Sequence, residues 1–124
     1  MPRTDHDQAA ALGNSRRTLR RAGADELDRR PWQHARQPPA DTELTRFALW
    51  ASGRAGQDEA AVLEAGLTLL AAARAEIDQL EAGLLFAARS SGLTWTQIAD
   101  ALGLASAQAA QQRCDRVTDR VAER

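Results

Sequence analysis

The chain has 124 residues, with 17 acidic and 16 basic side chains and a formal net charge of −1 at pH 7. This length suits one domain, or a small domain with a tail, and argues against Rossmann and barrel enzyme folds. Every basic residue is arginine, 27 residues are alanine, and tyrosine is absent. Because alanine favours helices and β-branched residues are scarce, the composition predicts an all-α fold.

Signals for targeting, metal binding and catalysis are missing from the sequence. The first residues lack the apolar core of a signal peptide, and the longest uncharged apolar stretch, residues 65–73, is too short for a membrane span. The single cysteine, Cys114, is typical of a reducing cytosol, and two histidines far from it give no zinc pattern. We therefore expect a cytoplasmic protein that is not an enzyme and has no cofactor or membrane partner.

The N-terminal part shows weak helical signals. Residues 1–14 are polar and have no periodicity, which predicts a disordered leader. Residues 15–56 are expected to form a helical segment with a proline-rich linker around residues 31–39. The second helix of this segment is expected to begin after a capping residue at Asp41 or Thr42.

Residues 57–91 carry the longest helical pattern and contain no proline. A continuous helix of this length would span about 50 Å, at 1.5 Å per residue. Apolar residues recur in it at heptad-like spacing: Leu63, Leu70, Ala73, Ile77, Leu80, Leu84 and Ala87. Two interpretations stay open for this stripe, an ordinary core helix and the seam of a homodimer.

Residues 78–124 carry the clearest signals for a compact unit. Thr94 is expected to cap a short helix, Gly103 to adopt the positive φ of a sharp turn, and Ser106 to cap the last helix. No strand pattern follows, so the sequence predicts a tri-helical helix-turn-helix unit without a wing, entered by the long central helix.

Packing within this unit follows from the spacing of small and apolar residues. Ile98 and Leu102 lie one turn apart and are expected to bury against the long helix, while the small Ala99 lets the next helix cross closely. Leu104 is expected to fill the corner of the turn. The last helix has one narrow apolar face, formed by Ala110, Cys114, Val117 and Val121. We therefore expect Cys114 to be an inert buried thiol.

The opposite face of the last helix is polar. It carries Ala107, Gln108, Gln111, Gln112 and Asp115. Glutamine can hydrogen-bond N6 and N7 of adenine in the major groove, and the helix N-terminus at Ser106 suits a phosphate. The same glutamines also suit an ordinary solvated helix surface. Arg113, at the edge of this face, either contacts DNA or pairs with an acid such as Asp100 or Glu81.

The stretch GLTWTQIADALGLASAQAAQQR, residues 92–113, resembles the helix-turn-helix of small actinobacterial DNA-binding proteins and transcriptional regulators. The family pattern is of the type G-x-S/T-W-x-x-I/L-A-x-x-L-G-V-S-R-Q-A-A-x-x-R, and the resemblance covers residues 69–118. This chain has an extra turn residue, Ala105, and Ala107 replaces the common arginine. The resemblance and the helix faces together imply a DNA-facing set of Ser106, Ala107, Gln108, Gln111, Gln112, Arg113, Arg116, Thr94 and Thr96.

The distribution of charge opposes strong DNA binding. Phosphate neutralisation dominates affinity for DNA, yet residues 92–124 hold four basic and four acidic side chains. The cluster of Arg16, Arg17, Arg20 and Arg21 is a candidate basic arm, or else a solvated segment or a contact for an acidic partner. Our first hypothesis is a homodimeric, nucleoid-associated regulator that binds double-stranded DNA. The alternative is a helical module that uses the same fold to bind another protein.

Overall fold

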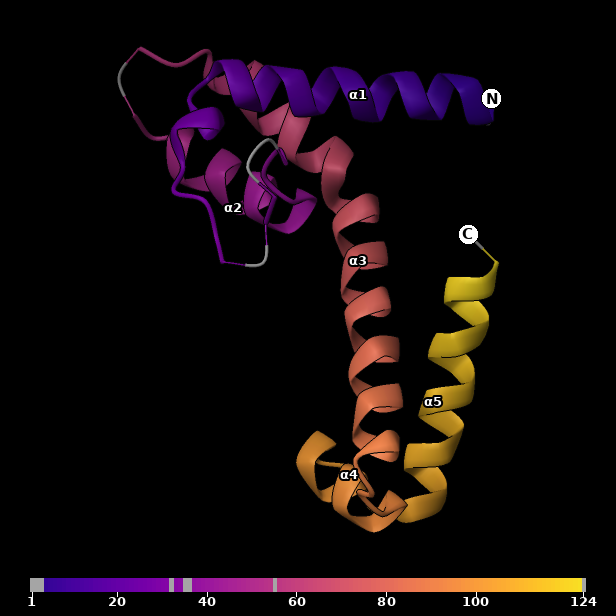
Figure 1. The fold of residues 1–124 in the computed structure, drawn as a ribbon. Helices are drawn as coiled ribbons and strands as arrows, with labels where there is room; N and C mark the ends of the chain where they lie inside the picture. Colours follow the sequence, from indigo (N-terminus) through magenta and orange to yellow (C-terminus); the bar gives the residue numbers. More distant parts are fainter. Residues whose placement is uncertain (1–3, 32, 35–36, 55, 124) are drawn as a thin grey trace. The chain divides into compact units, whose positions relative to one another are not determined.

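The computed structural model describes residues 4–31, 33–34, 37–54 and 56–123 (Figure 1). Within these ranges the secondary structure is helical, without a strand, which confirms the all-α prediction and the long central helix. No helix in the same ranges has the length and apolarity that a membrane crossing needs. The elements are α1 (Asp5–Arg21), the 3₁₀ helix η1 (Ala24–Glu26), α2 (Asp41–Ala51), α3 (Glu59–Ser90), α4 (Trp95–Leu102) and α5 (Ala107–Ala122).

The chain divides into two compact units, Met1–Arg74 and Ala75–Arg124, and α3 contributes its first half to one and its second half to the other. The boundary of the second unit lies three residues before the start of the unit expected at residues 78–124. The local structure of each unit follows from its own residues.

Helix α1 begins much earlier than the sequence suggested. The Asp7 backbone N–H donates to Thr4 Oγ1 at 3.0 Å, which caps the helix, and Asp5 adds a negative charge near its N-terminus. The prediction of a disordered leader is therefore wrong for residues 5–14, whereas residues 1–3 lie outside the described residues. The helical segment expected to begin at residue 15 therefore begins inside α1.

The first unit has a core built from α1, η1, α2 and the first half of α3. Its buried members are Leu19, Ala24, Leu44, Phe47, Ala48, Ala51, Val62, Ala65 and Leu69. Helix α2 begins at Asp41 after Ala40, which provides no side-chain cap, so the expected capping role of Asp41 or Thr42 is wrong. Asp41 instead accepts two hydrogen bonds from Arg16, at 2.8 and 3.0 Å. This contact raises the pKa of Arg16 and joins α1 to the start of α2.

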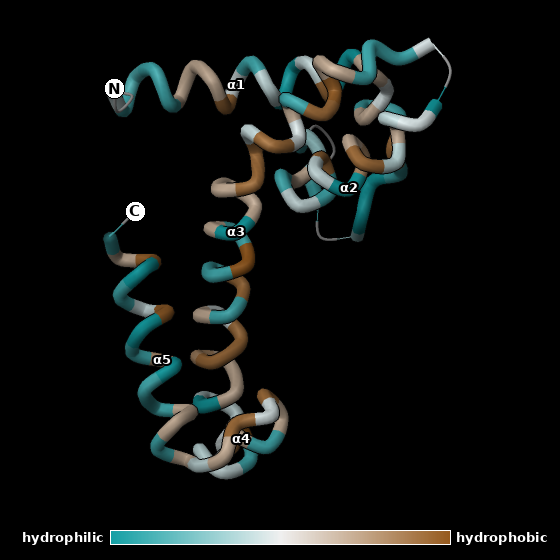
Figure 2. Tube along the Cα trace, turned by 180° about the vertical axis from the view of Figure 1, so that it is seen from behind, coloured by the Kyte–Doolittle hydropathy of each residue, from teal (hydrophilic) through white to brown (hydrophobic). Residues whose placement is uncertain are grey.

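The second unit consists of the last half of α3 with α4 and α5. In Figures 1 and 2 this half of α3 runs antiparallel to α5. The buried core residues are Leu85, Ile98, Ala99, Ala110 and Val117, and Trp95, Leu104 and Cys114 pack against them. Leu102 remains 36% exposed, so its expected burial beside Ile98 is wrong. Leu102 is the last residue of α4 and does not belong to this core.

The heptad-like stripe of α3 is mostly uncovered by the described residues. Only Ala73 among its seven positions is buried, while Ile77, Leu80 and Leu84 are 52%, 56% and 71% exposed. In the first unit α3 buries a different set, which includes Val62. An ordinary core helix thus accounts for little of this stripe.

Candidate nucleic-acid interface

Helix α4 begins and ends at the residues that the sequence predicted, Thr94 and Gly103. The Gln97 backbone N–H donates to Thr94 Oγ1 at 3.1 Å, and the Thr94 backbone N–H donates to Gln97 Oε1 at 2.8 Å. This reciprocal pair is a capping box. At the other end Gly103 has φ 72° and ψ 25°, a left-handed conformation that glycine adopts without steric cost. Both predictions, the Thr94 cap and the positive φ of Gly103, are confirmed.

The turn after α4 leads directly into α5. The Leu104 backbone N–H donates to the Ala99 carbonyl at 2.8 Å, and Leu104 packs against the core at the corner. Ser106 is extended, and its Oγ accepts a hydrogen bond from the Ala109 N–H at 3.1 Å. Helix α5 has no acidic residue in its first turn, so its positive dipole end is not neutralised. The predicted Ser106 cap and the role of Leu104 are confirmed.

Helix α5 has one apolar and one polar face, as its periodicity indicated. Ala110 and Val117 are fully buried, and Cys114 and Val121 are half-buried. On the other face Gln108, Gln111, Gln112, Asp115 and Arg116 are all exposed. Figure 2 shows α5 hydrophilic over most of its length. The three glutamine side chains are therefore available for hydrogen bonds to a partner.

Four further members of the expected DNA-facing set lie at the starts of α4 and α5. Ser106 and Thr96 are exposed, and Ala107 is half-buried at the start of α5. Thr94 is exposed, but its hydroxyl already accepts the capping hydrogen bond of α4. Ala105, the extra turn residue, is exposed beside Ser106.

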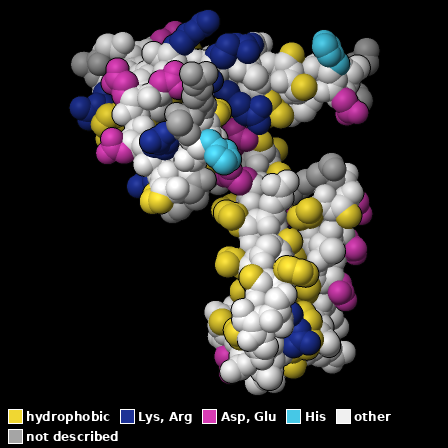
Figure 3. All heavy atoms as spheres, viewed as in Figure 1, with side chains coloured by type: hydrophobic (Ala, Val, Ile, Leu, Met, Phe, Trp, Pro, Cys, Tyr) yellow, Lys and Arg dark blue, Asp and Glu magenta, His cyan; other side chains and the backbone are white. Residues whose placement is uncertain are grey.

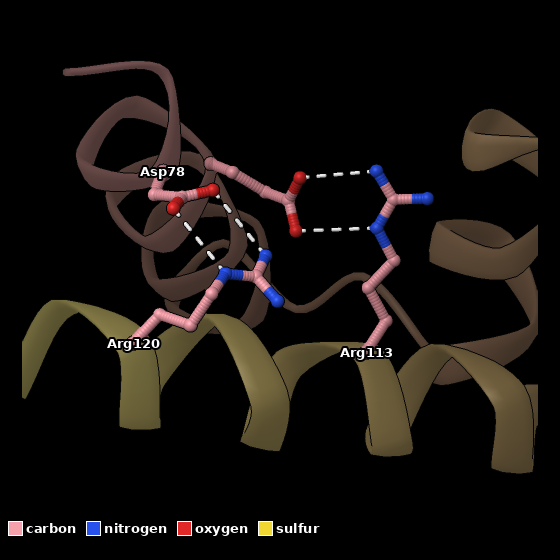
Figure 4. A network of polar contacts seen from close by, with 4 residues as sticks. Asp78, Arg113 and Arg120 are labelled. Carbon is pink, nitrogen blue, oxygen red and sulfur yellow. Dashed lines mark hydrogen bonds and ion pairs between the residues drawn. The ribbon is translucent and has the colours of Figure 1, made fainter. Parts of the chain in front are cut away.

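Two arginines of α5 are held by carboxylates of α3 (Figure 4). Arg113 donates from Nε and Nη2 to Glu81 at 3.2 and 3.0 Å. Arg120 donates in the same two-pronged way to Asp78 at 3.2 and 3.3 Å. The hydrogen bonds and charge of Glu81 raise the pKa of Arg113. Of the two interpretations of Arg113, these contacts fit pairing with Glu81.

The second unit therefore presents little positive charge to a phosphate backbone. It contains five arginines and seven acidic residues, which gives a formal charge of −2. Arg116 is exposed and has no ion pair within the described part of the chain. Attraction to phosphate would depend on Arg116, on Arg89, which is exposed and donates to the Leu93 carbonyl, and on the backbone N–H groups at helix N-termini.

The arginine cluster of α1 is also partly neutralised. Arg16 is bound to Asp41, and Arg20 donates to Asp25 at 2.7 Å. Arg17 hydrogen-bonds Asn14, and Arg21 is exposed. Within the described part of the chain, a basic arm built from this cluster would thus present two of its four guanidinium groups without a carboxylate partner.

Sequence reasoning missed the pairing of Arg120 with Asp78. The signal was present, because Asp78 and Glu81 lie three residues apart on α3 and Arg113 and Arg120 lie seven apart on α5. Helical periodicity places the two acids on one face of α3 and the two arginines on one face of α5. The acids and the arginines therefore face each other when the helices run antiparallel. Among the described residues no group of His, Cys, Asp and Glu could hold a metal ion.

The row of Gln108, Gln111 and Gln112 offers an uncharged, hydrogen-bonding surface beside the capped N-terminus of α5. Each glutamine amide can donate and accept at the same time, which suits the edge of a base or the polar surface of another protein. No protein family, curated protein or solved structure matches this chain.

Proposed function

We propose that the second unit is a helix-turn-helix module that binds double-stranded DNA, with α5 lying in the major groove. The observation that carries the proposal is the exposed row of Gln108, Gln111 and Gln112 next to the Ser106-capped start of α5. In this function the amides read adenine through N6 and N7. The chain would act in the cytoplasm as a bacterial transcriptional regulator or a small nucleoid-associated protein.

Positioning on DNA would fall to a few groups. The N-terminal N–H groups of α5, together with Thr96 and Arg116, would contact phosphates. Arg113 would stabilise the packing of α5 on α3, because its guanidinium is bound to Glu81. With one unpaired arginine on α5 among the described residues, a single copy would bind weakly, and we propose that the protein acts as a homodimer with two reading helices.

A duplex-binding assay with genomic fragments at low salt tests this function. We expect the native chain to select some fragments over others. The double variant Gln108→Ala/Gln111→Ala should weaken binding to selected fragments by at least about 10-fold, because each lost base contact contributes roughly 1–3 kcal/mol. Arg116→Ala should weaken binding to all fragments alike and reduce the salt slope by about 1.

The matched control is Gln79→Ala, which removes an exposed glutamine from α3 and should leave DNA binding unchanged. Thermal unfolding of each variant should match that of the native chain, since the changed side chains are exposed. Failure of the native chain to bind any fragment at low salt would contradict the proposal.

A second candidate function is supported by the charge of the same unit. The unit has a formal charge of −2, and two of its arginines form ion pairs with acids of α3. Both features favour a surface that binds another protein over one that binds phosphates. In that case Gln108, Gln111 and Gln112 would hydrogen-bond a protein surface. The assay above separates the two functions, because a protein-binding module would show no preference among DNA fragments.

A further inference from the structure

Helix α3 carries an uncovered apolar stripe within the second unit. Ile77, Leu80 and Leu84 are 52%, 56% and 71% exposed, and Ala87 in line with them is also exposed. Figure 2 shows hydrophobic segments on the side of α3 away from α5, and Figure 3 shows hydrophobic side chains at the surface along α3. Their spacing of three, four and three residues is the spacing of core positions in a coiled coil.

The stripe contains no charged side chain. Two acids of this part of α3, Asp78 and Glu81, are held by Arg120 and Arg113 of α5, and the third, Glu76, is half-buried. Gly83 lies beside the stripe, and nothing stands within 4 Å of the position a Cβ would occupy there. A second helix backbone can therefore approach α3 closely at this point.

We propose that a second copy of this chain packs antiparallel on this stripe. The spacing of three, four and three reads the same in both directions, so the surface is complementary to itself about a twofold axis. In this register Leu80 lies opposite the partner's Leu84, and Ile77 lies opposite the partner's Ala87. Each large side chain at the outer positions thus meets a small one, as interdigitated packing requires.

The area of the stripe sets the strength of this association. At about 200 Å² for a fully exposed leucine or isoleucine, the three large side chains expose roughly 350 Å², the size of a functional surface patch. A stable dimer buries about 800 Å² on each partner. The stripe alone therefore supports weak self-association, which neighbouring binding on one DNA duplex would strengthen through effective concentration.

Sedimentation equilibrium of the full chain without DNA tests the inference. We expect a monomer–dimer equilibrium with a dissociation constant on the order of 100 µM. Leu80→Glu and Leu84→Arg should each weaken it at least 10-fold, because each places a charge against an apolar partner. The double variant Leu80→Glu/Leu84→Arg should restore dimerisation, since the antiparallel register sets each glutamate opposite the partner's arginine.

Two controls make the test specific. Leu80→Glu/Leu84→Glu should stay monomeric, and Leu49→Glu, at a leucine 76% exposed on α2, should leave the equilibrium unchanged. Far-ultraviolet circular dichroism checks that every variant keeps its helices. A native chain that stays monomeric near 1 mM, an unchanged dimer in Leu80→Glu, or no recovery in the charge-pair variant would overturn the inference. The outcome is independent of the DNA assay, because a dimer that ignores DNA would contradict only the proposed function.

Discussion

Helix α2 of the first unit and helices α4 and α5 of the second begin with contacts of different range. In the first unit, α1 is joined to the rest by Leu19 in the core and by the Arg16–Asp41 pair, which links residues 25 positions apart. In the second unit, α4 and α5 begin at hydrogen bonds between residues three positions apart, at Thr94 and Ser106. We therefore expect large losses of stability from changes in the core of the first unit, and smaller losses from changes to the caps of α4 and α5.

Leu19→Ala tests the dependence of the first unit on its core and should have the largest effect. Leu19 is fully buried, and truncation of a buried leucine costs about 2–5 kcal/mol of unfolding free energy. Leu49→Ala, at an exposed leucine of α2, should change it by less than about 0.5 kcal/mol. Urea denaturation followed by circular dichroism measures both. Equal effects of the two changes would show that α1 does not depend on Leu19.

Gly66→Ala tests the close approach of α2 and α3 in the first unit. An added Cβ at Gly66 would lie 2.7 Å from the Cβ of Ala48, so the helices must move apart. Overpacking of this kind costs about 1–3 kcal/mol. Gly83→Ala in the same helix has open space around the new methyl group and should stabilise by roughly 0.5–1 kcal/mol. Thermal unfolding at low protein concentration should show opposite shifts, and shifts of the same sign would contradict this packing.

Ser106→Ala tests the local capping that defines the second unit. Loss of the hydrogen bond from the Ala109 N–H should cost about 1 kcal/mol of unfolding free energy. Thr118→Ala removes an exposed hydroxyl from the C-terminal half of α5 and serves as the control, with little or no loss expected. Chemical denaturation compares the two variants. A Ser106 variant as stable as the control would show that α5 does not need its cap.

Glu81→Gln has the smallest expected effect on stability and a distinct effect on DNA binding. The pair with Arg113 is partly exposed, so its loss should cost about 0.2–1 kcal/mol. The freed guanidinium should strengthen non-specific DNA binding and raise the salt slope by up to about 1. Titration of a duplex at several salt concentrations measures this change. An unchanged slope would mean that Arg113 does not reach phosphate even when released.

The same difference in range explains which features could be predicted from the sequence. Thr94, Gly103 and Ser106 act within their own turn, so their roles follow from residue type and position. The exposed glutamines of α5 follow from its helical period. The pairing of Arg113 with Glu81 was one of two open interpretations, because an arginine at the edge of a face can turn either way.

Features that depend on distant residues escaped the sequence analysis. The contact between Arg16 and Asp41 has no local pattern in the sequence. The helical state of residues 5–14 does have a local signal, the capping spacing of Thr4 and Asp7, but it was missed because the segment is polar and has no apolar period. Leu102 has the period of a core residue, but the core of the second unit ends at Ile98 and Ala99 on α4. Periodicity identifies an apolar face, and only tertiary packing decides how far along the helix that face is covered.

The proposed DNA-reading surface is the exposed face at the start of α5. The most direct test is a nuclear magnetic resonance titration of the full chain with a duplex selected in the binding assay. We expect the largest shift changes in the backbone amides of residues 106–112, with smaller changes at the start of α4. Changes confined to another surface, while the amides of residues 106–112 stay in place, would contradict the account.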